Sequence, residues 1–288
     1  MKRILVASGG ANKFAWEVGA FYFLAKTLNR KYDGYAGISA GALLAGIASM
    51  HENPLDAANQ AKLLLDQVTT KKIHKRHFPF GYLHGLWKPS FRNSEPLHDW
   101  VRSIVNREKM LSSGKELKVG GVSLTTGEYK LWSEQDEDIA EGIIASSAFP
   151  IMFTPIKTQG QLWTDGGVRH ITPIRTAIVD MEATEIDVLI TGHWDDVTPI
   201  KDKPNAIDVA LKTVDILLDQ IMGADVKQAQ LYNELVQAGC REDKRFVKMN
   251  ILTPRSPMNY DSLSFEPEIM NKMFQQGMRD AKGMKWDV

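Results

Sequence analysis

The sequence predicts an α/β protein in which helices flank a mostly parallel central sheet in three layers. Short continuous apolar runs of strand length alternate with longer stretches whose apolar residues recur at helical spacing. The first fifty residues also run strand, glycine-rich loop, helix, strand, tight turn and helix, which is how a right-handed parallel sheet begins. Because no internal repeat or low-complexity linker interrupts the 288 residues, we expect a single domain over 1–288, with a motif-bearing core over about 1–200 and an extension over 201–288.

The opening unit can be assigned from its residue pattern. Residues 2–7 form a buried strand because an apolar run follows the two basic residues and a Ser-Gly-Gly turn ends it. Residues 15–28 carry large apolar side chains at helical spacing, which predicts a helix. Residues 35–38 are predicted to form a second short strand, and the small residues of 40–50 a second helix.

The rest of the chain continues the alternation of helix and strand. Further helices are expected at 55–68, 96–105, 136–145, 206–238 and 266–282, and strands at 117–124, 129–132, near Leu162, at 187–191 and at 245–252. The dipeptide Thr126-Gly127 is a turn signal, so the two strands on either side of it are expected to pair as a hairpin.

Charge and cysteine content exclude several classes of protein. Lys plus Arg and Asp plus Glu balance at 35 each, so no overall field attracts nucleic acid and any lipid contact must be local. The single Cys240 excludes an intramolecular disulfide and fits a reducing compartment. The apolar run at the N-terminus is too short for a signal-peptide core, and no run of about 20 apolar residues predicts a membrane span. We therefore expect a soluble, cytoplasmic protein.

The strongest local motif is Gly37-Ile38-Ser39-Ala40-Gly41, which fits Gly-x-Ser-x-Gly. Between a strand and a helix this pattern places the serine on a sharp, strained turn, and the flanking glycines let neighbouring backbones approach. The start of the following helix favours negative charge developing near Ser39. The alternative interpretation is a turn of small residues without chemistry.

Two further segments contain glycines beside polar residues. Residues 8–13, Ser-Gly-Gly-Ala-Asn-Lys, join the first strand to the first helix and offer backbone N–H donors to an anion. A nucleotide loop or a plain tight turn is the alternative, although no complete phosphate-loop motif is present. Residues 164–167, Thr-Asp-Gly-Gly, hold an acidic residue near backbone level after a short apolar run. An ordinary Asp-Gly turn is the alternative there.

Taken in this order, the three motifs resemble those of the patatin-like phospholipases, and the resemblance covers residues 4 to 174. Residues 145–150 and 168–173 look like the same family. The resemblance implies a fatty-acyl ester substrate, a catalytic dyad of Ser39 and Asp165, and no metal or cofactor. It also implies that the oxyanion hole and its support come from the residues of the glycine-rich loop. These are Gly9, Gly10 and Ala11 as donors, with Lys13 at the family's basic position.

The loop departs from the family pattern at two positions. Ala11 stands where a third glycine is usual, and Phe14 stands where a glycine follows the basic residue. If position 11 requires a positive φ, alanine there costs on the order of 1 kcal/mol and reshapes the loop without removing its N–H groups. Phe14 is expected to narrow the acyl entrance.

Three alternatives to a dyad hydrolase stay open at this point. An α/β-hydrolase triad would use Ser39, Asp165 and either His170 or His193, although that fold places its elbow after several strands. A non-catalytic lipid- or anion-binding protein would keep the elbow geometry, and Ala11 and Phe14 favour it. An acyltransferase would form the same acyl-enzyme and pass the acyl group to another acceptor.

Two segments outside the motifs carry predictions about contacts. Residues 71–92 combine a basic cluster with aromatic residues, interrupted by Pro and Gly, and are interpreted as a lid that touches a membrane surface or as a cap over the cleft. Residues 206–238 are predicted to form a core helix or, alternatively, a dimer interface, so the sequence is compatible with a homo-oligomer. Asp195, Asp196 and Asp202 lack the spacing of a calcium loop.

Overall fold

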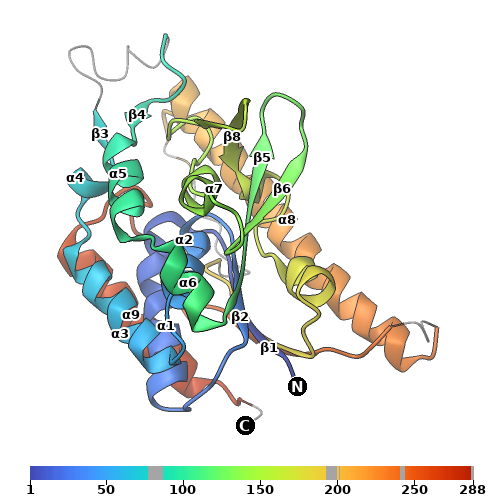
Figure 1. The fold of residues 1–288 in the computed structure, drawn as a ribbon. Coiled ribbons are helices and arrows are strands. Elements are labelled where there is room, and N and C mark those ends of the chain that lie inside the picture. The colour runs from blue at the N-terminus through green and yellow to red at the C-terminus, as the bar shows by residue number, and fades with distance from the viewer. Residues whose placement is uncertain (77–86, 193–199, 201, 241–243, 287–288) are drawn as a thin grey trace.

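The central sheet follows the strand order β10-β9-β1-β2-β5-β8-β7, and β6 also pairs with β5 (Figure 1). The computed structural model describes residues 1–76, 87–192, 200, 202–240 and 244–286. The strands that run parallel are β10 (Lys248–Leu252), β9 (Glu185–Leu189), β1 (Arg3–Ala7), β2 (Gly34–Gly37) and β5 (Glu116–Ser123). The antiparallel strands are β6 (Tyr129–Ser133), β7 (Ile156–Thr158) and β8 (Gln161–Asp165). The predicted mostly parallel sheet is confirmed, and it carries an antiparallel edge.

Helices cover both faces of the sheet. One face packs against α1 (Phe14–Lys26), α2 (Ala40–Ser49), α3 (Pro54–Gln67), α7 (Ile139–Ser146) and α9 (Pro267–Gly283), and the other against α8 (Ala206–Gln237) and a π-helical turn (Thr176–Asp180). The remaining helices are α4 (Thr70–Ile73), α5 (Glu95–Ile104) and α6 (Arg107–Ser113), with 3-10 turns at Ala11–Lys13 and Gly166–Val168. A ribbon of β3 (Lys75–Arg76) and β4 (Arg92–Asn93) stands apart from the main sheet.

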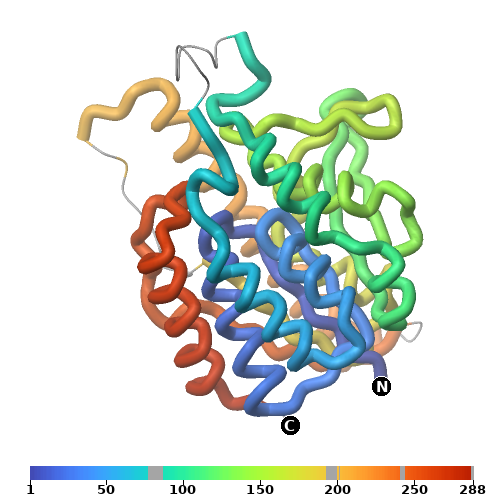
Figure 2. Tube along the Cα trace, turned by 60° about the vertical axis from the view of Figure 1, so that its left-hand side comes forward, coloured from blue at the N-terminus to red at the C-terminus, as the bar shows by residue number. Residues whose placement is uncertain are grey.

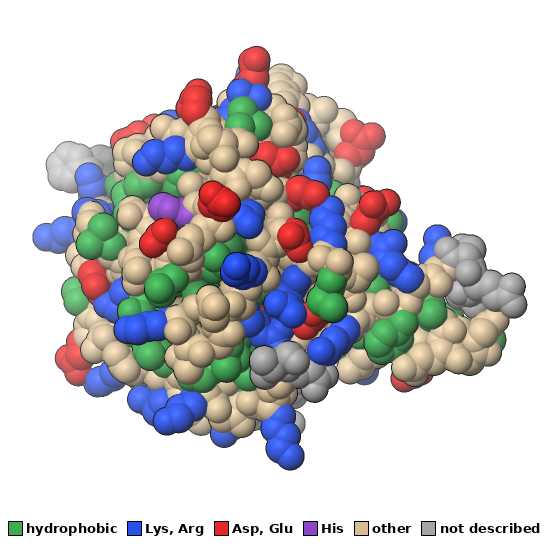
Figure 3. Space-filling view, turned by 60° about the horizontal axis from the view of Figure 1, so that its bottom comes forward, with side chains coloured by type: hydrophobic (Ala, Val, Ile, Leu, Met, Phe, Trp, Pro, Cys, Tyr) green, Lys and Arg blue, Asp and Glu red, His purple; other side chains and the backbone are tan. Residues whose placement is uncertain are grey.

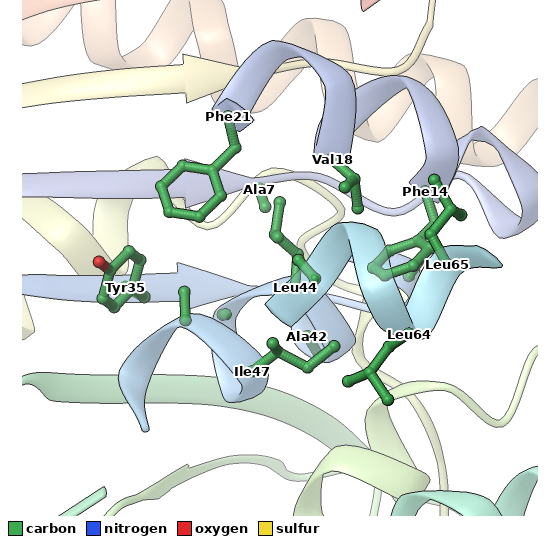
Figure 4. Packing of buried hydrophobic residues seen from close by; sticks show 14 of the residues in the cluster. Ala7, Phe14, Val18, Phe21, Tyr35, Ala42, Leu44, Ile47, Leu64 and Leu65 are labelled. Carbon is green, nitrogen blue, oxygen red and sulfur yellow. The ribbon is translucent and has the colours of Figure 1, made fainter. Parts of the chain in front are cut away.

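The alternation of side chains along β1 explains the three layers. Leu5 and Ala7 belong to the core under α1, α2 and α3, whereas Ile4 and Val6 belong to the core on the α8 face. A strand buried on both faces is therefore continuously apolar, which is the pattern seen at the N-terminus. Figure 4 shows the first of these cores, where side chains of α1, α2 and α3 meet over β1 and β2.

Helices α1 and α9 lie side by side (Figure 2). They can approach closely because each carries a glycine at the contact. A Cβ at Gly19 would collide with the carbonyl of Phe274, and a Cβ at Gly277 would collide with the carbonyl of Trp16. The C-terminal helix is thereby built into the same layer as the first helix.

Most predicted elements are present, with shifts at their ends. The strand predicted at 187–191 lies at Glu185–Leu189, because Glu185 is a charged residue that pairs with Arg3 at the start of the strand. The strand predicted from residue 245 begins at Lys248. Helix α6 and strand β7 were not predicted, since each is too short to show a period.

The surface carries charges of both signs, in keeping with the balanced composition. The face in Figure 3 presents both cationic and anionic side chains. In the described part of the chain, no helix combines the length and apolarity that a bilayer crossing requires. Of the predicted lid at 71–92, residues 77–86 lie outside the described residues; Trp87 is 78% exposed.

Candidate active site

Ser39 occupies the turn between β2 and α2 in a strained backbone conformation. Its φ is 56° and its ψ is −123°, a region that residues other than glycine seldom adopt. A Cβ at Gly37 would collide with the carbonyl of Gly41, and one at Gly41 would collide with the carbonyl of Ala7. The glycines on both sides of Ser39 are thus needed for close backbone approach, as the motif predicts.

The end of α7 holds the backbone of this turn from the other side. The Ser39 N–H donates to Ser146 Oγ at 3.0 Å, and Ser147 Oγ donates to the Ser39 carbonyl at 3.2 Å. Both serines are buried. Sequence reasoning noted the stretch 145–150 as similar to the family but assigned these hydroxyls no role, and only the spatial contact reveals one.

The register of three neighbouring strands brings Asp165 level with Ser39. Gly37 pairs with Val119 across β2 and β5. Two residues further along each chain lie Ser39 and Gly121, and Gly121 pairs with Asp165 across β5 and β8. The sheet therefore unites two motifs that are more than a hundred residues apart in the sequence.

Asp165 is a buried carboxyl, and no cationic side chain of the described residues pairs with it. Its Oδ1 accepts the Gly167 N–H at 2.7 Å, and its Oδ2 is buried without a hydrogen bond of ordinary geometry. Burial raises the pKa of Asp165 to about 7, while hydrogen bonding from the Ser39 hydroxyl and the Gly167 N–H opposes the rise. A carboxyl with that pKa is a far better base at neutral pH than one in water.

The glycine-rich loop lies against Ser39, where a Cβ at Gly9 would come within 3.1 Å of the Ser39 Cβ. The Gly9 N–H already donates to the Ile171 carbonyl at 3.1 Å. Among the described residues, no hydrogen bond is made by the N–H groups of Gly10 or Ala11. Ala11 has φ 50°, so the positive φ anticipated at this position is present and an alanine bears it.

A pocket of about 440 Å³ opens over Ser39 and the loop. Its wall is mostly apolar and comes from both halves of the chain. The part of the chain before residue 154 supplies Leu43, Val68, Ile73, Leu97, Trp100, Phe149, Met152 and Phe153, and the part after residue 210 supplies Leu211, Leu218, Met222, Met258, Leu263 and Phe265. Residues of α8 and of the segment 258–265 thus form one side of the pocket, although the sequence assigned this part of the chain no role at the site.

Lys13 and Phe14, at the end of the glycine-rich loop, also reach the pocket. Lys13 lines it together with Lys212, Asp215, Asp219 and Asp261, so the polar part of the wall carries both signs. Phe14 lines the pocket too and is buried against the core. The phenylalanine therefore occupies volume in the wall of the pocket, and that it narrows an acyl entrance stays a prediction.

Of the two histidines proposed for a triad, the structure describes only His170, and its ring contacts Asp225 and Tyr129. His170 Nδ1 lies 3.2 Å from Asp225 Oδ1 and packs edge-on against Tyr129. His193 lies outside the described residues. No histidine of the described chain lines the pocket, and within the same residues no group of three or more metal-binding side chains is found.

Comparison with known proteins gives the family. The sequence pattern of the patatin-like phospholipase family matches residues 5–178. "Probable lipid hydrolase 463L" of Invertebrate iridescent virus 6 is 28% identical over 185 residues, covering 61% of this chain and 63% of the viral protein. The match thus leaves more than a third of the viral protein's own length unaligned.

Two solved structures are similar in parts of their fold. VipD from Legionella pneumophila matches at TM-score 0.46 and 12% identity, covering 98% of this chain and 66% of VipD. The ExoU chain from the type III secretion system of Pseudomonas aeruginosa matches at TM-score 0.31 and 16% identity, covering 79% of this chain and 51% of that one.

The sheet order, the strained serine turn and the neighbouring buried aspartate define an α/β protein with a nucleophile-type elbow. The family match covers more than half of the chain and includes all three motifs. The chain belongs to the patatin-like phospholipase family.

Proposed function

We propose that this protein is a lipid acyl hydrolase, of the phospholipase A type, that works through a Ser39–Asp165 dyad and an acyl-enzyme. One observation carries the proposal: a buried carboxyl with a pKa of about 7 and no cationic partner lies beside a serine on a strained turn. Ser39 lines an apolar pocket of about 440 Å³, which is large enough for a fatty-acyl chain, since ligand pockets typically measure about 300–1,000 Å³.

The first half of the reaction transfers the acyl group to the protein. Asp165 accepts the Ser39 hydroxyl proton while Ser39 Oγ attacks the ester carbonyl. The tetrahedral oxyanion is bound by the N–H groups of Gly10 and Ala11, each donor being worth about 3 kcal/mol of barrier. The Gly9 N–H is not assigned to the oxyanion, because it donates to Ile171. When the intermediate collapses, Asp165 gives the proton to the departing alcohol.

The second half releases the fatty acid. Water attacks the acyl carbonyl on Ser39 and passes a proton to Asp165, and the same N–H groups bind the second oxyanion. Collapse of this intermediate returns the proton to Ser39 Oγ and frees the carboxylic acid. The apolar wall, with Leu43, Phe149 and Phe153 among its residues, suits the hydrocarbon chain.

The test measures fatty-acid release from phosphatidylcholine vesicles and from a short-chain chromogenic ester, with chelator present. Wild type is expected to hydrolyse at least one of them, and Ser39→Ala and Asp165→Asn to lose activity by at least roughly 10⁴-fold while remaining folded. Mass spectrometry of the intact chain, quenched during turnover, is expected to show one acyl group on wild type and none on Ser39→Ala. A folded wild type without activity on either ester, or an Asp165→Asn variant with full activity, contradicts the proposal.

A further inference from the structure

The carbonyl of Gly9 is held by two hydroxyls that no part of the dyad mechanism uses. Thr191 Oγ1 donates to the Gly9 carbonyl oxygen. Ser8 Oγ lies 3.3 Å from the same oxygen and accepts the Thr191 N–H at 3.0 Å. Thr191 and Ser8 are both buried. Thr191 follows β9 and Ser8 follows β1, two strands that are neighbours in the sheet, so the fold itself brings these hydroxyls together.

The bond to Gly9 has a consequence for the next residue. The Gly9 carbonyl and the Gly10 N–H belong to one peptide unit, and in a planar trans peptide these two groups point in opposite directions. A donor that fixes the carbonyl therefore fixes the N–H as well, directed away from Thr191 Oγ1. In the part of the chain that the structure describes, the Gly10 N–H makes no bond of its own, and Gly10 lines the same pocket as Ser39.

Such a peptide needs an external restraint. Glycine on both sides allows rotation of the whole peptide unit at little steric expense. After rotation the carbonyl oxygen would point where the N–H pointed, and an acceptor would replace the donor. The N–H of Gly9 is also restrained, because it donates a hydrogen bond to the Ile171 carbonyl at 3.1 Å. The two bonds together leave one orientation.

We propose that Thr191, assisted by Ser8, is a positioning residue that aims the Gly10 N–H at the oxyanion by holding the Gly9 carbonyl. This inference rests on the proposed hydrolase function. It predicts that the Thr191 hydroxyl acts on the transition state and leaves substrate binding unchanged, because the ester carries full negative charge on oxygen only after Ser39 attacks.

The experiment compares Thr191→Val, which keeps the shape and removes the hydroxyl, with Thr191→Ser, which keeps the hydroxyl. Thr172→Val is the matched control, since the Thr172 hydroxyl is also buried but has no hydrogen-bond partner among the described residues. We expect Thr191→Val to lower kcat roughly 10- to 100-fold with KM within about 2-fold of wild type. Thr191→Ser is expected to keep kcat within about 3-fold, and Thr172→Val to match wild type.

The outcomes separate this inference from the proposed function. An inactive wild type overturns the proposed function. An active wild type, an inactive Ser39→Ala and a Thr191→Val variant with wild-type kcat overturn the positioning role alone. Equal losses in kcat for Thr191→Val and Thr191→Ser also overturn it, because the hydroxyl would then be irrelevant. If Thr191→Val does not fold, Ser8→Ala provides the test: a several-fold fall in kcat at unchanged KM supports the role, and an unchanged kcat contradicts it.

Discussion

Two buried carboxyl groups in opposite surroundings lie one strand in from the two edges of the sheet, Asp187 near the β10 edge (the paired end) and Asp165 near the β7 edge (the unpaired end). Asp187, on β9, accepts hydrogen bonds from Arg30 at 3.1 Å, Tyr32 at 2.7 Å and Asn250 at 2.7 Å. Asp165, at the end of β8, accepts one backbone N–H, and no cation from the part of the chain that the structure describes lies beside it. Burial raises the pKa of both groups, but at Asp187 a guanidinium, an amide and a phenol oppose the rise.

The difference separates a carboxyl whose donors give it a structural role from one that is placed to act as the base of the proposed dyad. A carboxylate fully occupied by donors has no lone pair left for a proton from another group, and its charge is neutralised in place. Asp165 keeps a free oxygen and a pKa of about 7 beside the Ser39 hydroxyl. What distinguishes the proposed base is therefore the lack of a cationic partner among the described residues, together with the neighbouring Ser39 hydroxyl.

The largest expected change in stability is at the paired end. Arg30→Met would leave Asp187 and Glu185 buried without the guanidinium that lies 3.1 Å from both. We expect the free energy of unfolding to fall by roughly 3–5 kcal/mol, and the activity of the folded fraction to stay unchanged. Urea denaturation followed by circular dichroism measures the first, and active-site-normalised kcat the second.

Lys272→Met is the matched control for Arg30→Met. It removes an exposed pair with Glu268 at 2.7 Å, and such pairs contribute little. We expect no measurable change in unfolding. If Arg30→Met were as stable as this control, the paired end would not be the structural element described.

The second largest change in the free energy of unfolding is expected at the unpaired end, where substitution of Asp165 should stabilise the protein. The pKa of Asp165 is about 7 in the folded chain and about 3.9 in an unfolded one, so folding favours the protonated carboxyl. The associated stability is complete below about pH 4 and is lost as the pH rises to about 7. Asp165→Asn escapes this loss and is expected to be more stable than wild type by up to about 4 kcal/mol at neutral pH and above.

Urea denaturation of wild type and Asp165→Asn across this pH range checks the sign. The gap between the two proteins should widen as the pH rises from about 4 to about 7 and then level off. A difference in the free energy of unfolding that is constant with pH, or a variant less stable than wild type at about pH 8, would show that burial does not raise the pKa of Asp165 as described.

The smallest expected change lies in the loop opposite Asp165. Ala11 has φ 50°, a conformation that costs a residue with a Cβ about 1–2 kcal/mol and glycine much less. Because glycine loses more entropy on folding, we expect Ala11→Gly to gain at most about 1 kcal/mol in thermal or urea unfolding. Ala224→Gly, within helix α8, is the control and should lose about 1 kcal/mol. If both substitutions lowered stability by similar amounts, the result would contradict the positive φ at Ala11.

The sequence predicted the features that depend on short stretches of chain. The strand and helix around Ser39, the glycine loop and the Asp-Gly-Gly turn each follow from neighbouring residues, and their order identified the family. The charged start of β9 was placed two residues late, because Glu185 is stabilised by Arg3 and Arg30, which are remote in sequence. A pattern of apolar residues cannot report such a partner.

The sequence could not predict contacts that exist only after folding. Thr191, Ser146 and Ser147 act through bonds to Gly9 and Ser39, and nothing in their local sequence marks the hydroxyls as buried donors or acceptors. The pocket wall from α8 and residues 258–265 lies beyond the family match, which ends at residue 178. The apolar residues of α8 have the same spacing as those of an ordinary core helix.

The most direct test of the account is the pH dependence of kcat/KM for a soluble ester between about pH 5 and pH 9. Only the carboxylate form of Asp165 can accept the Ser39 proton, so kcat/KM should rise with pH and reach a plateau with a midpoint near the pKa of about 7. A profile that is flat across this range, or one that already reaches its plateau near pH 5, would contradict the claim that Asp165 is a buried base with a raised pKa.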